Sequence, residues 1–102
     1  MIVARWYVKA RFGMKPQVIE KVKAWWDVVG KVIGQSKHTL MTGSVGAEES
    51  LVTMDVWVND MGELQQQWDA MAGSEVHQRF AEELEPLIVS GSTKWEIFRV
   101  IE

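Results

Sequence analysis

The fold is decided by the central stretch from residue 39 to residue 59, TLMTGSVGAEESLVTMDVWVN. Its two ends, residues 39–45 and 51–59, are rich in apolar and β-branched side chains and are typical of strands. Residues 46–50 between them are polar and begin with a glycine, as expected of a turn. The stretch therefore predicts two strands joined near the middle of the chain.

The same pattern extends outward on both sides of this joint. Upstream, residues 2–12 read as a strand, and a helical stretch runs from Pro16 to about Gly34. Downstream, residues 61–88 read as a broken helix and residues 93–101 as a last strand. The order βαββαβ within 102 residues predicts one domain, 1–102, of the α+β class. Its ferredoxin-like arrangement has an antiparallel four-stranded sheet with two helices on one face.

Alternation along the strands divides the expected sheet into two unlike faces. One face is wholly apolar and is expected to pack under the helices: Ile2, Ala4, Trp6, Val8, Ala10, Phe12, Val52, Met54, Val56 and Val58. The other face mixes charges with aromatic rings, among them Arg5, Tyr7, Asp55 and Trp57. Such a mixture is typical of a surface that meets a second protein.

Composition excludes several classes of partner. The net charge is -3, and the 11 Lys and Arg are scattered, so nucleic acid is not expected as a partner. The sequence has neither an apolar run of the ~20 residues that span a bilayer nor the layout of a secretion signal. No membrane association is therefore expected. The absence of cysteine excludes disulfides and fits a cytoplasmic location.

The second helical region contains the clearest local signals. Asp60 followed by Glu63 has the spacing of a capping box, and Pro86 is expected to end or kink the region. Gly73 interrupts the helix, and Ser74 then has the character of the cap of a second segment. Two short helices that meet at such a break leave a notch, which could form one wall of a pocket.

Six tryptophans in 102 residues call for an explanation. Filling of the core and of an interface is one interpretation, because Trp has a large apolar area and a single N–H. The other is that some of them line a cavity for a flat, apolar ligand. We expect Trp26 and Trp68 in that role, because each lies on a helix whose apolar face is broader than packing on a sheet requires.

His77 is the candidate for proton chemistry. It follows the break at Ser74, and histidine has its ordinary pKa close to neutrality. A partly exposed histidine in the first turn of a helix is the alternative interpretation. His38 is expected at the surface, and two histidines 39 positions apart give no metal-binding motif, so no metal is expected.

Four short runs resemble a known group of proteins: VWVN (56–59), LQQQW (64–68), GSEVHQRF (73–80) and LEPL (84–87). Together with the element order, they are similar to the second half of the dimeric α+β barrel proteins. Within that group the resemblance is to the antibiotic biosynthesis monooxygenase-like and NIPSNAP-like members. It implies a homodimer whose sheets meet face to face, with a pocket in each subunit between helices and sheet.

The resemblance also limits which enzymatic activities are expected of this chain. Members of the group include cofactor-independent oxygenases, haem-degrading oxygenases, isomerases, cyclases and proteins with no known reaction. The haem-degrading members place their ligating histidine near the position of Ala81 and an asparagine in the first strand, where this chain has Arg5, Trp6 and Tyr7. These departures argue against haem degradation and leave haem-like or other flat ligands open.

The resulting hypothesis is a homodimer that binds a flat apolar or aromatic molecule and acts on it like a monooxygenase, without a cofactor. The expected walls of the site are Trp26, Trp68, Met71 and Phe80, and His77 is the expected acid or base. The alternatives are a binding protein without chemistry, which could include a haem carrier, and a protein whose main activity is interaction through its sheet.

Overall fold

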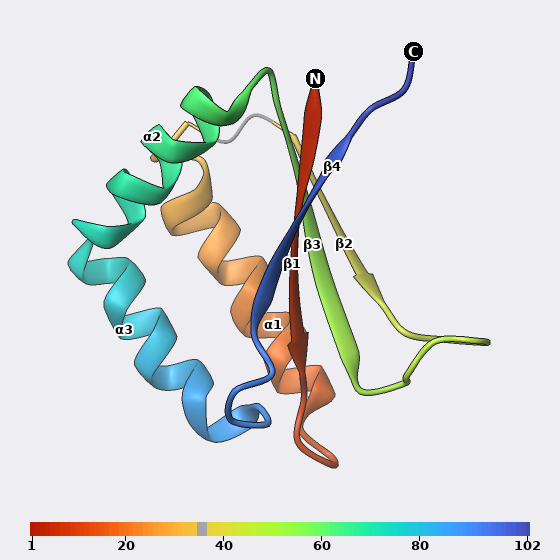
Figure 1. Ribbon diagram of the computed structural model, residues 1–102. Coiled ribbons are helices and arrows are strands. Elements are labelled where there is room, and N and C mark those ends of the chain that lie inside the picture. The colour runs from red at the N-terminus through yellow and green to blue at the C-terminus, as the bar shows by residue number, and fades with distance from the viewer. Residues whose placement is uncertain (35–36) are drawn as a thin grey trace.

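The chain alternates strands and helices in the order expected from the sequence (Figure 1). A computed structural model describes residues 1–34 and 37–102. Within this described part, the elements are β1 (Ile2–Lys9), α1 (Lys15–Trp25), the π-helical turn η1 (Trp26–Gly30), β2 (His38–Thr42), β3 (Leu51–Val58), α2 (Met61–Ala72), α3 (Glu75–Leu84), the 3-10 turn η2 (Glu85–Leu87) and β4 (Lys94–Arg99).

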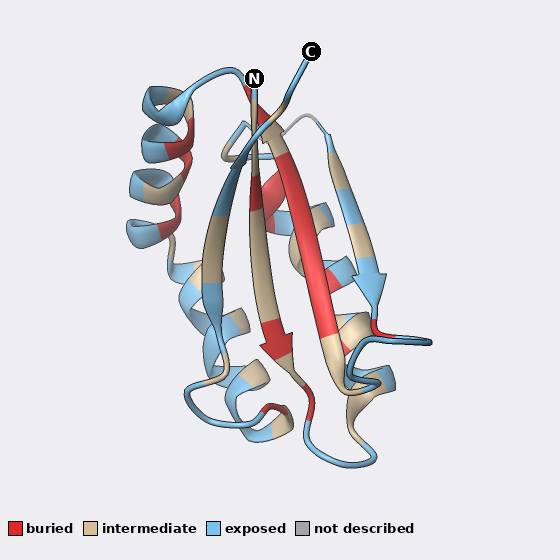
Figure 2. Cartoon of the chain, turned by 45° about the vertical axis from the view of Figure 1, so that its right-hand side comes forward, coloured by how far each residue is buried: buried red, intermediate tan, exposed pale blue. Residues whose placement is uncertain are grey.

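The four strands form one antiparallel sheet in the order β2-β3-β1-β4. In β1, Ala4 is opposite Val56 of β3 on one side and Ile97 of β4 on the other. The helices lie together on one face of this sheet, as Figures 1 and 2 show from two directions. The predicted α+β, ferredoxin-like fold is therefore confirmed.

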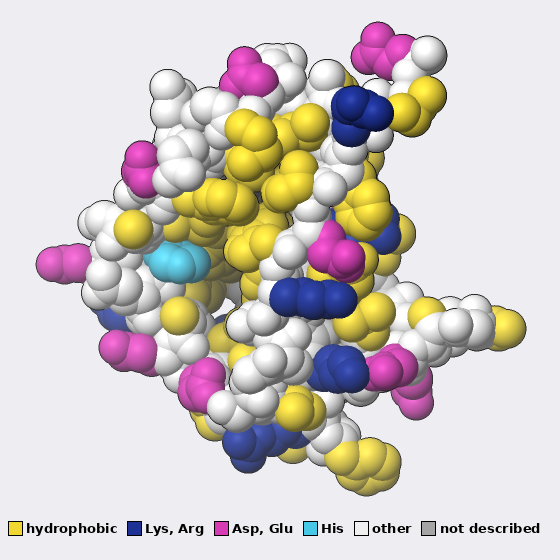
Figure 3. Space-filling view, viewed as in Figure 1, with side chains coloured by type: hydrophobic (Ala, Val, Ile, Leu, Met, Phe, Trp, Pro, Cys, Tyr) yellow, Lys and Arg dark blue, Asp and Glu magenta, His cyan; other side chains and the backbone are white. Residues whose placement is uncertain are grey.

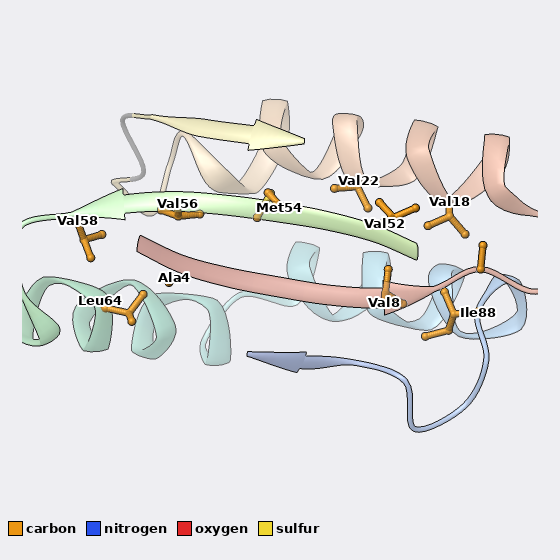
Figure 4. Close-up of a cluster of buried hydrophobic side chains, with 11 residues drawn as sticks. Ala4, Val8, Val18, Val22, Val52, Met54, Val56, Val58, Leu64 and Ile88 are labelled. Carbon is orange, nitrogen blue, oxygen red and sulfur yellow. The ribbon is translucent and has the colours of Figure 1, made fainter. Parts of the chain in front are cut away.

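The core lies between the sheet and the helices. It contains helix-facing residues of β1 and β3, apolar side chains of α1 and α2, and Ile88, which follows η2. Figure 4 shows these residues: Ala4, Val8, Val18, Val22, Val52, Met54, Val56, Val58, Leu64 and Ile88. Leu64 of α2 is only 1% exposed. Alternation in the sequence thus identified the buried face of both central strands.

The first strand is shorter than predicted. β1 ends at Lys9, and Ala10 adds only an isolated bridge to Ile88. Phe12, predicted on the buried face, is fully exposed. The cause is a turn around Gly13, whose backbone angle φ of 80° is a left-handed conformation that favours glycine. The alternating pattern continues past the point where the backbone leaves the sheet.

The first helix also ends earlier than predicted. It begins at Lys15 with Pro16 in its first turn, where the missing N–H of proline removes no helical hydrogen bond. Regular α-helix ends at Trp25, and the chain continues as the wider π-helical turn η1. A π-helical turn holds more residues than an α-helical one and therefore changes which side chains face the sheet.

The break between the second and third helices lies where the sequence places it. The N–H of Glu63 donates to Asp60 Oδ1 at 2.9 Å, which caps α2. The N–H of His77 donates to Ser74 Oγ at 3.1 Å, which caps α3. Within the described part of the chain, none of the helices has the length and hydrophobicity that a membrane crossing needs.

Candidate functional site

A cavity of about 350 Å³ lies between α1, α3 and the sheet. Figure 3 shows hydrophobic side chains lining a recess between α3 and β4. α3 itself contains no fully buried residue, although its apolar residues Phe80 and Leu84 face inward. Both side chains are half-buried and border the cavity, and Leu84 also packs against the core. The cavity therefore exists because α3 is held away from the sheet.

Three tryptophans form much of the wall. Trp6 of β1 and Trp95 of β4 are opposite each other in the sheet, and both border the cavity. Trp25, the last residue of α1, borders it from the helix side. Met54 and Val22 complete the apolar floor. Flat aromatic rings on several sides favour a flat, apolar occupant.

The structure brings together three of the five side chains expected at the site. Met71, His77 and Phe80 border the cavity. Trp68 is not among the lining residues; its ring packs edge-on against that of Trp95, with ring centres 5.5 Å apart. Trp68 thus supports a wall residue from behind.

Trp26 lies outside the cavity, in contrast to the expectation from the sequence. Its ring is stacked on His38, with centres 3.6 Å apart and an interplanar angle of 22°. Burial in this contact lowers the pKa of His38 below its ordinary value of 6.5. The neighbouring Trp25 occupies the cavity wall instead. Adjacent positions on a helix point about 100° apart, so only one of the two can face the site.

His77 is held at two points. Its backbone N–H donates to the capping hydroxyl of Ser74, and its ring accepts a hydrogen bond from Trp25, Nε1 to Nδ1, at 2.9 Å. The two rings meet edge to face, with centres 6.0 Å apart and planes at 72°. Burial lowers the pKa of His77 below its ordinary value of 6.5, because the charged form loses solvation. His77 is thus kept neutral near pH 7.

The other polar groups of the cavity are Lys21, Glu85 and Thr93. Lys21 forms an ion pair with Glu83, which ties α1 to α3 beside the cavity. In residues 1–34 and 37–102, no group of three or more His, Asp or Glu side chains is arranged to hold a metal ion. The polar character of the site is therefore modest and is concentrated at its helical side.

The sheet face away from the helices, here called the outer face, has a second, shallower depression. It is lined by Val3, Arg5, Asp55, Trp57 and Phe98. Arg5 binds Asp55 through two hydrogen bonds, at 2.7 Å and 2.9 Å, and this hydrogen bonding raises the pKa of Arg5. Its guanidinium lies 5.2 Å from the ring centre of Phe98, which is 44% exposed. The outer face thus combines an ion pair with exposed apolar surface.

Comparison with known proteins identifies the fold. No family model and no curated protein matches the sequence. Among solved structures, a NIPSNAP family protein from Agrobacterium tumefaciens is 17% identical with a TM-score of 0.82, and the match covers 99% of this chain and 93% of that one. The chain has the same fold as this protein. The resemblance expected from the sequence is thus confirmed for the architecture.

Two further solved structures extend the likeness to proteins described as oxygenases. One, from Caulobacter crescentus, is described as an antibiotic biosynthesis monooxygenase; it is 15% identical, with a TM-score of 0.73 over 99% of this chain and 90% of that one. The other is a variant of SnoaB, a cofactor-independent oxygenase from Streptomyces nogalater; it is 11% identical, with a TM-score of 0.63 over 99% and 93%. At these identities the likeness concerns the fold alone.

Proposed function

We propose that this protein is a homodimer that binds a flat, largely apolar small molecule and acts on it as a cofactor-independent, monooxygenase-like enzyme. The cavity is the observation that carries the proposal. Its volume of about 350 Å³ is within the usual range of small-molecule sites, roughly 300–1,000 Å³. Three tryptophans, Phe80 and Met71 give it an aromatic and apolar wall with few polar groups.

The proposed chemistry starts with loss of a proton from an enolic or phenolic substrate, or from a CH₂ group next to such a system. His77 is a half-buried ionisable group in the wall. Its Nδ1 accepts from Trp25, so it can assist this step as the acid, by donating a hydrogen bond to the substrate oxygen that gains negative charge, while water takes up the proton. The resulting anion adds O₂ at carbon, the peroxide anion regains a proton from water, and the hydroperoxide then loses water. CH₂ and O₂ thereby become C=O and H₂O, so O₂ is the only oxidant required.

Anthrone is a suitable probe because it is flat, tricyclic and has one such CH₂ group. We expect the protein to accelerate O₂ uptake by anthrone, measured with an oxygen electrode against the protein-free rate. His77→Ala should abolish the acceleration, whereas His38→Ala, a matched change outside the cavity, should keep it. Unchanged turnover in His77→Ala would remove His77 from the mechanism.

A binding protein without chemistry is the second candidate, and the small number of polar groups in the cavity favours it. Lys21 is already paired with Glu83, which leaves His77, Glu85 and Thr93 as the remaining polar wall. Binding of anthrone without accelerated O₂ uptake would select this candidate over the enzyme. Haem carriage is less well supported, because a histidine that binds iron through Nε2 has its other nitrogen as a donor, and Nδ1 of His77 is an acceptor.

The homodimer part of the proposal depends on the outer face. Phe98 and Met41 are 44% and 41% exposed there, and Trp57 borders the same depression as Phe98. Association would remove this apolar area from water. We expect sedimentation equilibrium to show a dimer, Phe98→Asp to give monomers, and Phe12→Asp, a change at a fully exposed turn residue, to leave the dimer intact. A monomeric wild-type protein at micromolar concentration would contradict the assembly.

A further inference from the structure

We propose that Trp25 is a positioning residue that holds His77 in the tautomer with its proton on Nε2, so that the cavity selects flat ligands with an oxygen acceptor. The chemical class is an aryl ketone, a quinone or a phenolate. This inference rests on the proposed function, in that the cavity must bind a small molecule. It adds the polar feature by which the site would distinguish one flat molecule from another.

The hydrogen bond between the two side chains decides the tautomer. Indole Nε1–H is a donor only, so the nitrogen that faces it must offer a lone pair. In this structure that nitrogen is Nδ1 of His77, 2.9 Å from Trp25 Nε1. A neutral imidazole carries one proton on its two nitrogens. The proton is therefore on Nε2.

The surroundings keep this arrangement in place. The backbone of His77 is fixed by the Ser74 cap, and its ring is fixed by the edge-to-face contact with Trp25. In the described part of the chain, Nε2 makes no hydrogen bond to protein. Lys21 is engaged by Glu83, and the hydroxyl of Thr93 can rotate. Nε2–H is thus a donor whose direction is set before a ligand arrives.

A ligand without an acceptor would displace water from this donor and leave it unpaired, which weakens binding. A ligand with a suitably placed oxygen would instead receive the hydrogen bond. An oxygen that gains negative charge during proton loss would receive a stronger one. The lowered pKa of His77, caused by burial, is consistent with a neutral donor, and Lys21 and Glu85 are the charged groups that share its cavity.

The test compares 9-fluorenone with fluorene, two flat tricyclic molecules that differ by a carbonyl group in place of CH₂. Equilibrium dialysis should show that wild-type protein binds 9-fluorenone roughly threefold to tenfold more tightly, the effect of one net hydrogen bond. His77→Phe should lose this preference and still bind both molecules. His38→Phe should keep the preference, because His38 lies outside the cavity.

A second measurement addresses Trp25 directly. Long-range ¹H–¹⁵N NMR spectra of the wild-type protein should show His77 with Nδ1 unprotonated and Nε2 protonated. Trp25→Phe removes the N–H and keeps an aromatic ring, so the spectra should then show a mixture of tautomers, with a reduced preference for 9-fluorenone. A purely structural role for Trp25 would leave the tautomer unchanged.

The outcomes separate this inference from the proposed function. Equal affinity for the two probes, or a wild-type spectrum with the proton on Nδ1, would refute the assignment of Nε2–H of His77 as the donor. The cavity would still stand as a binding site. Failure of both probes to bind would overturn the cavity as a binding site and the inference with it. The wild-type spectrum keeps the test decisive even if Trp25→Phe does not fold.

Discussion

The Ser74 cap should control the stability of α3 and, through it, the shape of the cavity. Ser74→Ala removes the oxygen that accepts the N–H of His77. Loss of such a cap destabilises a protein by about 1 kcal/mol, within a range of roughly 0.5–2 kcal/mol. α3 has no fully buried residue, so little core packing compensates for the lost hydrogen bond. The helix should open locally more often.

Asp60→Ala provides a matched control, because Asp60 caps α2 by the same kind of hydrogen bond. Urea denaturation at fixed protein concentration should give each variant a free energy of unfolding about 1 kcal/mol lower than the wild type. The corresponding decrease in Tm is roughly 4–8 °C for a domain of this size. The two variants should differ in which helix opens: α3 in Ser74→Ala and α2 in Asp60→Ala.

Native-state hydrogen exchange locates the opening. Ser74→Ala should raise the exchange of α3 amides about fivefold, the factor that corresponds to 1 kcal/mol, and should weaken binding of 9-fluorenone. Asp60→Ala should raise exchange in the first turn of α2 and leave α3 and the binding nearly unchanged. Equal exchange of α3 amides in the two variants, or no loss of stability in Ser74→Ala, would refute the reasoning.

Two further predictions concern the core and the titration of the protein. Leu64→Ala should lower the free energy of unfolding by about 2–5 kcal/mol, because Leu64 is 1% exposed. The slope of the free energy of unfolding against urea concentration should stay the same. A loss below about 1 kcal/mol would contradict the place of Leu64 in the core. Burial lowers the pKa of His77 below 6.5, so the unfolded state binds more protons below that pH, and the protein should lose stability as the pH falls. Urea denaturation at pH 7.5 and pH 5 should show a smaller loss in His77→Phe than in the wild type, and an identical loss would count against a buried, neutral His77.

The sequence predicts the strands well because burial on one side of a sheet leaves a strict alternation. Val52, Met54, Val56 and Val58 are all buried, as that pattern requires. Phe12 shows the limit of the argument, since alternation does not reveal where the backbone turns away from the sheet. The left-handed turn at Gly13 is a local backbone event that the apolar pattern of residues 2–12 does not record.

The cavity was harder to predict than the fold. The helix break and Ser74 identified α3 as a wall and led to His77, because caps have a clear local signature. Trp26 was expected in the wall, but Trp25 lies there, because the side chain that faces the cavity depends on the rotation of the helix at its transition into η1. Trp6 and Trp95 were missed as wall residues, although Trp6 was expected on the helix-facing side of its strand. Only the pairing of β1 with β4 brings these two rings together.

A crystal structure of the protein with bound 9-fluorenone tests the central claim most directly. We predict that the ligand lies between Trp6, Trp25 and Trp95, with its oxygen at hydrogen-bond distance, roughly 2.7–3.2 Å, from Nε2 of His77. A ligand bound elsewhere, or a space between α1, α3 and the sheet that is closed by the protein's own side chains, would contradict it.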